Sequence, residues 1–163
     1  MNNVDKKSLL VFIAKAHRHT YAAPEEIRIK YLCEYQVLHG HTDHEYSEGN
    51  FRYHDSYAGS TWAPGKEVVF YKDVPVWCMA YQGHTHPKHD EQFYQEQVFP
   101  FLKRALMKFE DDTPFRGPKE YSEDDFKYTF EIQGDYSYFK GQERIFYKDY
   151  VVFVQDVMGS LIR

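Results

Sequence analysis

The chain has 163 residues, a formal net charge of −5 and acidic and basic residues interspersed along its length. That pattern lacks the clustered Lys and Arg of a nucleic-acid-binding face, so we expect no direct contact with nucleic acid. The longest apolar run, Leu9 to Ala14, is too short to span a bilayer. The N-terminus has no signal-peptide pattern, and the two cysteines form no disulfide framework. These features predict a cytoplasmic protein without membrane contact.

The first half of the chain predicts one helix followed by strands. Residues 8–18 carry apolar side chains at helical spacing, and Asp5 is placed to cap that helix. Residues 25–38 fit either a strand or a helix, and the polar residues 39–45 indicate a loop. Strands are predicted at 51–57, 67–72 and 76–82, with a turn or short irregular strand at 59–65. Their short connections require antiparallel pairing.

The second half predicts the same order of elements. Residues 93–109 have helical spacing, and Pro100 either kinks this helix or stands near its first turn. Residues 111–114 end the helix, and three strands follow, from about 126 to 132, 143 to 148 and 151 to 157.

The two halves are also similar residue by residue. Residues 46–48 read Tyr-Ser-Glu and return at 121–123, while Phe-Tyr-Lys-Asp at 70–73 returns whole at 146–149. Single residues match in the same order with one gap: Phe51, Tyr53, Gly59, Gly65, Glu67, Val76 and Gly83 match Phe126, Tyr128, Gly134, Gly141, Glu143, Val152 and Gly159. We therefore predict an α+β fold built by internal duplication of a helix plus antiparallel meander, approximately residues 6–83 and 90–159. Because each half is too small for a sizeable core, the halves should share one core around a pseudo-twofold axis, in a single domain.

Matched faces of the predicted strands place two carboxylates inside the protein. Glu67 and Glu143 share a face with apolar and tyrosine side chains in both halves. A buried carboxylate is costly unless it is paired. We expect these two to meet tyrosine hydroxyls, Arg116 or each other, either as a purely structural network or as part of a site.

Differences between the halves favour the first half as the owner of a ligand cleft. Asp55 stands where the second half has Phe130, and Trp77 and Tyr81 stand where it has Phe153 and Val157. An acid among aromatic rings can orient a polar or cationic ligand, although the same residues also suit a core with Asp55 at its rim. The candidate ligand-binding residues are Tyr53, Asp55, Glu67, Trp77, Tyr81, Arg116 and Glu143.

Two loops carry histidines at metal-ligand spacing. His39, His41, Asp43 and His44 spell H-x-H-x-D-H, which resembles the metal motif of the metallo-β-lactamase fold over those six residues alone. His84, His86 and His89 repeat the spacing without the aspartate. Zinc is therefore one hypothesis for these loops and solvated histidines are the other, and no cofactor is predicted.

Six motifs recur in a fixed order along the chain, at residues 14–22, 53–59, 65–71, 75–83, 114–118 and 139–147. Together they resemble a bacterial family of domains of unknown function, numbered 5680, which occurs alone or behind Xre-type helix-turn-helix regulators. The resemblance covers most of the chain, and the segment from Pro24 to His44 departs from the family pattern.

Three functions remain open from the sequence. The resemblance implies a regulatory association and, with the aromatic faces, favours a small-molecule-binding or sensory module. The alternatives are a metal-dependent hydrolase using His39, His41, Asp43 and His44, and a protein-interaction domain or homodimer that pairs exposed strands. No nucleophile or phosphate-loop motif decides whether the protein is an enzyme.

Overall fold

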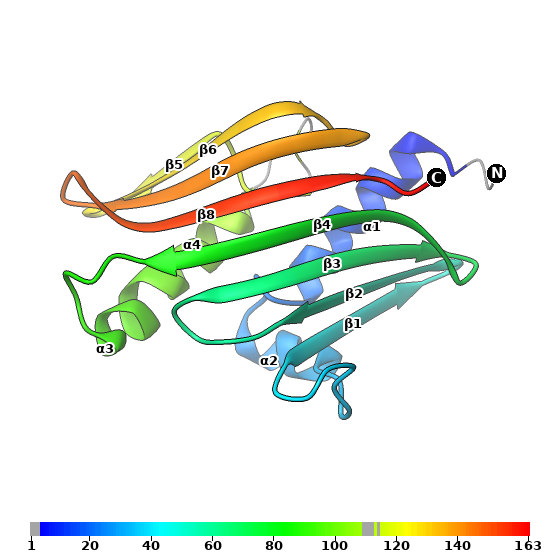
Figure 1. The fold of residues 1–163 in the computed structure, drawn as a ribbon, viewed down its shortest axis with the longest axis horizontal. Coiled ribbons are helices and arrows are strands. Elements are labelled where there is room, and N and C mark those ends of the chain that lie inside the picture. Colours follow the sequence, from blue (N-terminus) through cyan, green and yellow to red (C-terminus); the bar gives the residue numbers. More distant parts are fainter. Residues whose placement is uncertain (1–3, 109–112, 114) are drawn as a thin grey trace.

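The computed structural model describes residues 4–108, 113 and 115–163, and its dominant element is a single eight-stranded antiparallel sheet. The strands follow the order β1-β2-β3-β4-β8-β7-β6-β5, so each half of the chain forms a four-stranded meander and β4 pairs with β8 at the centre. The helices lie on one side of the sheet (Figure 1). The strands are β1 (Thr42–Glu48), β2 (Phe51–Tyr57), β3 (Ala63–Tyr71), β4 (Val74–Thr85), β5 (Glu120–Glu123), β6 (Phe126–Asp135), β7 (Tyr138–Tyr147) and β8 (Tyr150–Leu161). The fold is therefore α+β, as predicted.

Helix α1 (Lys6–His19) confirms the first predicted helix. Asp5 caps it, because its carboxylate accepts a 2.8 Å hydrogen bond from the backbone N–H of Ser8. The helix buries Leu9, Phe12 and Ile13 at helical spacing, and it packs on β1 and β2. None of the helices within residues 4–108, 113 and 115–163 has the length and apolarity needed to cross a membrane.

The helix around Pro100 is continuous but not regular. It consists of α3 (Glu91–Phe93), a π-helical turn at Tyr94–Val98 (η2) and α4 (Phe99–Leu106). Pro100 stands in the first turn of α4, where its missing N–H costs least. In the wider turn before it, Phe99 N–H donates to the carbonyl of Tyr94, five residues back, which explains how the chain accommodates the proline. The predicted helix end at Phe109 and the residues 111, 112 and 114 lie outside the described residues.

The segment between α1 and β1 is helical only in part. Helix α2 (Glu25–Arg28) is followed by a 3₁₀ turn at Ile29–Tyr31 (η1), so the strand alternative for this segment was wrong. An isolated bridge then joins Leu32 to His44, and Cys33 N–H donates to the Asp43 carbonyl. These contacts hold the irregular residues 32–41 beside strand β1.

Two short outer strands were not predicted. Strand β1 includes residues 42–45, which were predicted as a loop, and β5 forms at residues 120–123. Neither has an alternating apolar pattern. In β1 the adjacent Asp43 and His44 are both buried, because Asp43 accepts from the Val37 N–H and the His44 ring stacks on Tyr57.

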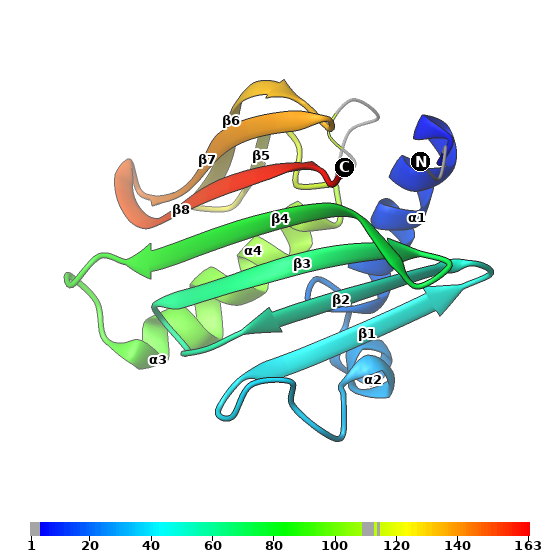
Figure 2. The same ribbon diagram turned by 45° about the vertical axis from the view of Figure 1, so that its right-hand side comes forward.

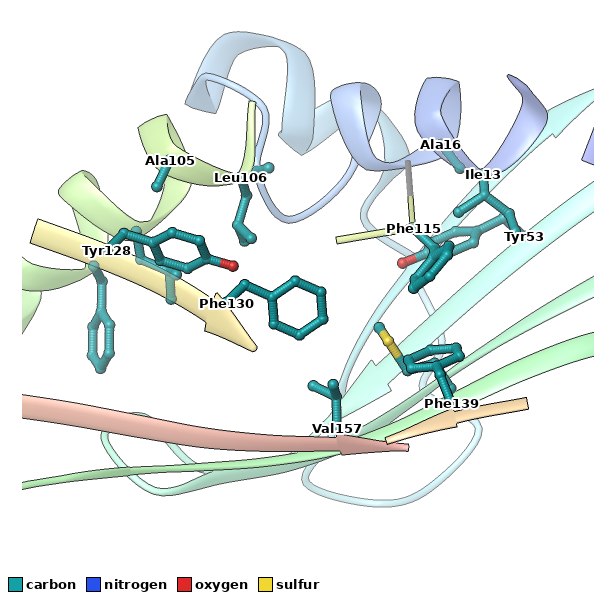
Figure 3. Packing of buried hydrophobic residues seen from close by; sticks show 14 of the residues in the cluster. Ile13, Ala16, Tyr53, Ala105, Leu106, Phe115, Tyr128, Phe130, Phe139 and Val157 are labelled. Atoms are coloured by element: carbon teal, nitrogen blue, oxygen red, sulfur yellow. The ribbon is translucent and has the colours of Figure 1, made fainter. Parts of the chain in front are cut away.

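One hydrophobic core joins the two halves. Ile13 and Ala16 of α1 and Ala105 and Leu106 of α4 face the sheet across a layer of aromatic rings (Figure 3). Phe115 and Phe139 lie in that layer with ring centroids 4.5 Å apart, and both are fully buried (Figure 3). Trp77 packs on the same two rings. The view in Figure 2 shows α1 and α4 behind the central strands β3 and β4.

Strand pairing is the same in both halves. Asp55 pairs with Glu67 as Phe130 pairs with Glu143, and an irregularity follows Val69 as one follows Ile145. Val69 and Ile145 are both fully buried. The surface contacts correspond too, because Tyr46 donates to Glu48 and Tyr121 to Glu123, while Lys15 and Arg104 pair with those glutamates. At the centre of the sheet, Tyr81 pairs with Val157, its counterpart in the alignment.

The two-residue turn after β7 offers a test of backbone strain. Lys148 and Asp149 both have positive φ angles, 47° and 66°, in a hairpin closed by Tyr147 and Tyr150. A lysine side chain is strained there by about 1 kcal/mol, whereas Asn-Gly is the preferred pair for such a turn. We expect Lys148→Asn with Asp149→Gly to raise the melting temperature by roughly 2–4 °C. Lys148→Val should lower the melting temperature. If the Val variant were as stable as the wild type, the backbone at residue 148 would not be strained.

Candidate functional site

A cavity of about 260 Å³ opens between the sheet and helices α2 and α4. It lies at the ends of β2 and β3 that are close to the 58–63 loop, and residues from both halves line it. Its apolar wall is formed by Phe99, Leu102 and Phe153. The polar residues that line it are Tyr21, Arg28, Thr42, Asp55, Tyr57, Ser60, Thr61, Glu67, Tyr81, Gln95, Lys103, Arg116 and Gln155.

A buried guanidinium lies at the inner end of this cavity. Arg116 Nε and Nη2 donate to the two oxygens of Glu143 at 2.8 and 2.7 Å, which is the bidentate arrangement that favours strong pairing. Tyr128 donates to Glu143 Oε1, and Gln155 Nε2 donates to its Oε2 at 2.8 Å. Burial alone would lower the pKa of Arg116, but Glu143 and then Glu67 raise it above the ordinary value. Arg116 therefore stays charged.

Glu67 connects that guanidinium to helix α1. Its Oε1 lies 3.8 Å from Arg116 Nη1, and its Oε2 lies 2.8 Å from Nε2 of the buried His17. Tyr53 packs edge-on against the His17 ring. The two glutamates predicted to share the interior thus both meet Arg116, and each has additional hydrogen-bond partners. These contacts offset the cost of burying the two carboxylates.

Asp55 is a buried acid on the cavity wall, 1% exposed and paired across the strands with Glu67. Tyr81 Oη donates a 2.7 Å hydrogen bond to its Oδ1. Burial, and then the Glu67 carboxylate, raise the pKa of Asp55 to about 8, despite the opposing effects of Tyr81 and Arg116. Burial and the neighbouring carboxylate therefore favour the protonated form of Asp55.

Two cationic side chains line the cavity from the helices. Arg28 comes from α2 and Lys103 from α4, and the Lys103 ammonium lies 5.2 Å from the centre of the Tyr21 ring. Arg28 Nε is buried without a hydrogen-bond partner among the described residues. Burial, then the charge of Arg28, lower the pKa of Lys103. Burial, then Arg28 and Lys103, also lower the pKa of His44 to about 4.

The structure brings four of the seven predicted ligand-binding residues to the cavity, namely Asp55, Glu67, Tyr81 and Arg116. The other three lie in the interior. Trp77 is fully buried and its indole N–H donates to the Tyr136 carbonyl, while Tyr53 packs on His17 and Glu143 lies behind Arg116. Trp77 therefore does not line this cavity: it shares the inner face of β4 with Tyr81 but lies farther along the strand, where Phe115 and Phe139 pack on it.

The histidine loops do not come together. Among the residues that the structure describes, no three His, Cys, Asp or Glu side chains are placed to hold a metal ion. His41 contacts Ser56, and Asp43 and His44 are adjacent on strand β1, where side chains alternate between faces. His84, His86 and His89 contact Trp62, Lys88 and Phe93, respectively, and His39 is exposed.

Several cavity residues were missed from the sequence. Arg28 lies in the segment whose structure was ambiguous, and Tyr21 follows α1 in an irregular turn. Gln155 carried one usable signal, because it replaces Met79 of the first half, and the structure places it against Glu143. His17, which does not line the cavity but contacts Glu67, falls on the buried face of α1, where a helical projection would have found it.

A second hollow, of about 540 Å³, lies on the opposite side of β1–β3 beneath residues 33–41. It is larger and more open than the first, and its lining includes the apolar side chains of Val37, Leu38, Val68 and Phe70. None of the buried charged residues around Arg116 lines it. The first cavity is therefore the stronger candidate site.

Comparison with known proteins agrees with the resemblance seen in the motifs. No curated protein and no solved structure matches the chain. The family described as a domain of unknown function, DUF5680, matches residues 55–162, about two thirds of the sequence. The match begins at Asp55 and includes Glu67, Tyr81, Lys103 and Arg116, whereas Arg28 lies before it. The chain belongs to the DUF5680 family.

Proposed function

We propose that the protein is a small-molecule-binding module whose ligand occupies the cavity between the sheet and helices α2 and α4. The observation that carries the proposal is the convergence of Asp55, Arg28 and Lys103 on one 260 Å³ cavity with an apolar wall. Binding sites in proteins are typically concave, mostly apolar and provided with a few fixed polar groups. A volume near the lower end of that class favours a small ligand.

The rigidity of the cavity floor supports binding rather than simple packing. Arg116, Glu143 and Gln155 hold one another by hydrogen bonds of 2.7–2.8 Å, and Arg116 and Gln155 reach the cavity. Side chains that are locked in this way present polar groups without a further entropic cost on binding. The site is thus preorganised at its inner end.

We also propose that the fold arose by duplication and that the cavity was acquired by the first half. The matching registers, and the pairing of Tyr81 with its counterpart Val157, support a pseudo-twofold axis between β4 and β8. Asp55 replaces Phe130 on the cavity wall. The resemblance to domains that follow helix-turn-helix regulators in the same chain supports a sensory role for the protein, in which it would bind this ligand in the bacterial cytoplasm.

A cavity-filling substitution tests the binding proposal. Ala63 lines the cavity and is half-buried, so Ala63→Phe should fill it, whereas Ala80→Phe on the exposed side of β4 makes the same change elsewhere. In a thermal-shift screen of metabolites of mixed charge, a ligand at 100 times its Kd should stabilise the wild type by about 2.7 kcal/mol. We expect Ala63→Phe to lose that shift and Ala80→Phe to retain it. A screen in which no compound stabilises the wild type would count against the proposal.

A further inference from the structure

We propose that the ligand of this cavity is an anion, a carboxylate or a phosphate monoester on a small apolar body, whose charged group binds between Arg28 and Lys103. This inference rests on the proposed function and specifies the class of molecule that the cavity takes. The apolar body would lie against Phe99, Leu102 and Phe153.

Within the part of the chain that the structure describes, Arg28 and Lys103 both lack an acidic partner. Among the described ion pairs, no carboxylate lies within 4.0 Å of either Arg28 or Lys103. Arg28 Nε is moreover buried with no hydrogen-bond acceptor among those residues. A buried charged donor without a partner costs more than a neutral one, so an acceptor at this point recovers that free energy. A carboxylate or phosphate oxygen is the acceptor that an arginine binds best.

The two cations also repel each other. Arg28 contributes to lowering the pKa of Lys103, which Glu25 only partly opposes, and both cations contribute to lowering the pKa of His44. An anion between Arg28 and Lys103 would replace that repulsion by two attractions. The electrostatic free energy of binding is therefore more favourable for a negatively charged ligand than for a neutral or positively charged one.

The acids at the inner end of the cavity are already engaged within the protein. Glu143 is engaged by Arg116, Tyr128 and Gln155, and Glu67 by His17 and Arg116. The remaining acid, Asp55, accepts from Tyr81, and its raised pKa favours the protonated, uncharged form. Each of these acids is thus paired or hydrogen-bonded within the protein, whereas among the described residues no carboxylate lies within 4.0 Å of the cavity cations Arg28 and Lys103. A cationic ligand would have to ionise Asp55 or break one of those bonds.

Isothermal titration calorimetry with three aryl probes tests the inference. Phenyl phosphate and benzoate are anionic, and benzamide has the shape of benzoate without its charge. We expect benzoate to bind at least tenfold more tightly than benzamide at low salt, with a loss of affinity as salt is added. Tighter binding of phenyl phosphate than of benzoate would assign the ligand to phosphate esters, and the reverse order to carboxylates.

Two charge-matched variants make the test specific. Arg28→Gln should weaken both anions at least tenfold and leave benzamide unchanged, whereas Arg144→Gln, on the opposite side of the sheet, should stay within twofold of the wild type. Lys103→Met provides a second variant with the same expectation should Arg28→Gln fail to fold. Equal binding of benzoate and benzamide, or anion affinity unaffected by Arg28→Gln, would overturn the inference.

The outcome also separates this inference from the proposed function. Suppose that neither anion binds, but a neutral or cationic metabolite stabilises the wild type and not Ala63→Phe. The anionic class of ligand would then be rejected, while the proposal that the cavity binds a ligand would stand. If no compound of any charge stabilises the wild type, the binding function itself is rejected.

Discussion

Arg116→Met is expected to lower the free energy of unfolding by about 3–5 kcal/mol, because it leaves Glu143 and Glu67 buried without their shared cation. Glu143 is fully buried, so water cannot replace the two lost hydrogen bonds without opening the core. Urea denaturation monitored by tryptophan fluorescence measures the change, since Trp77 is in the adjacent core.

Arg104→Met is the matched control for that substitution. Arg104 pairs with Glu123 through two contacts of 2.7 and 2.9 Å, but at the surface, where such pairs contribute at most about 1 kcal/mol. Adding Glu143→Gln to Arg116→Met should recover part of the loss, because a neutral amide is less costly to bury than a lone carboxylate. A loss for Arg116→Met no larger than that for Arg104→Met would contradict the role assigned to the buried pair.

Asp55→Asn is expected to stabilise the protein at alkaline pH and to remove one component of its pH dependence. The pKa of Asp55 is about 8 in the folded protein against 3.8 ordinarily, so above pH 3.8 the unfolded chain releases a proton that the folded state retains. The contribution of Asp55 to the free energy of unfolding is therefore fully present below pH 3.8. It decreases between pH 3.8 and pH 8, at a rate of at most about 1.4 kcal/mol per pH unit. Asparagine cannot ionise, and its oxygen can still accept from Tyr81.

Chemical denaturation of both proteins from pH 4 to pH 9 measures this component. The variant and the wild type should converge near pH 4 and diverge as the pH rises, with the variant the more stable at pH 8. His44 also titrates in this range, because its lowered pKa costs stability as the pH falls below 6.5. That contribution is present in both proteins, so the difference between them isolates Asp55. Parallel curves would show that Asp55 ionises normally in the folded state.

The central strands were predictable because their side chains alternate over an aromatic core. Phe51, Tyr53 and Asp55 share a face in the sequence pattern and in strand β2. Strands β1 and β5 were not predictable, since their polar residues are ordered by pairing with β2 and β6 rather than by their own apolar pattern. The π-helical turn before Pro100 likewise depends on hydrogen bonds that no residue pattern specifies.

The site was predictable where the two halves differ and hidden where the chain is irregular. Asp55 in place of Phe130 and the retained Glu67 and Glu143 indicated a polar interior, and all three lie around Arg116 and its cavity. Arg28 was missed because a four-residue helix has too little periodicity to be recognised. Trp77 was misplaced because periodicity gives a face of β4 but not the part of that face that a cavity reaches.

An NMR titration of the ¹⁵N-labelled protein with phenyl phosphate tests the central claim most directly, because it reports where a small anion binds. We predict saturable shifts confined to the cavity, led by the Arg28 side-chain N–H, the Lys103 and Thr42 amides and the side-chain amide of Gln155. Shifts centred instead on Val37, Leu38 and Phe70, in the hollow on the other side of the sheet, would contradict the account, as would shifts that do not saturate.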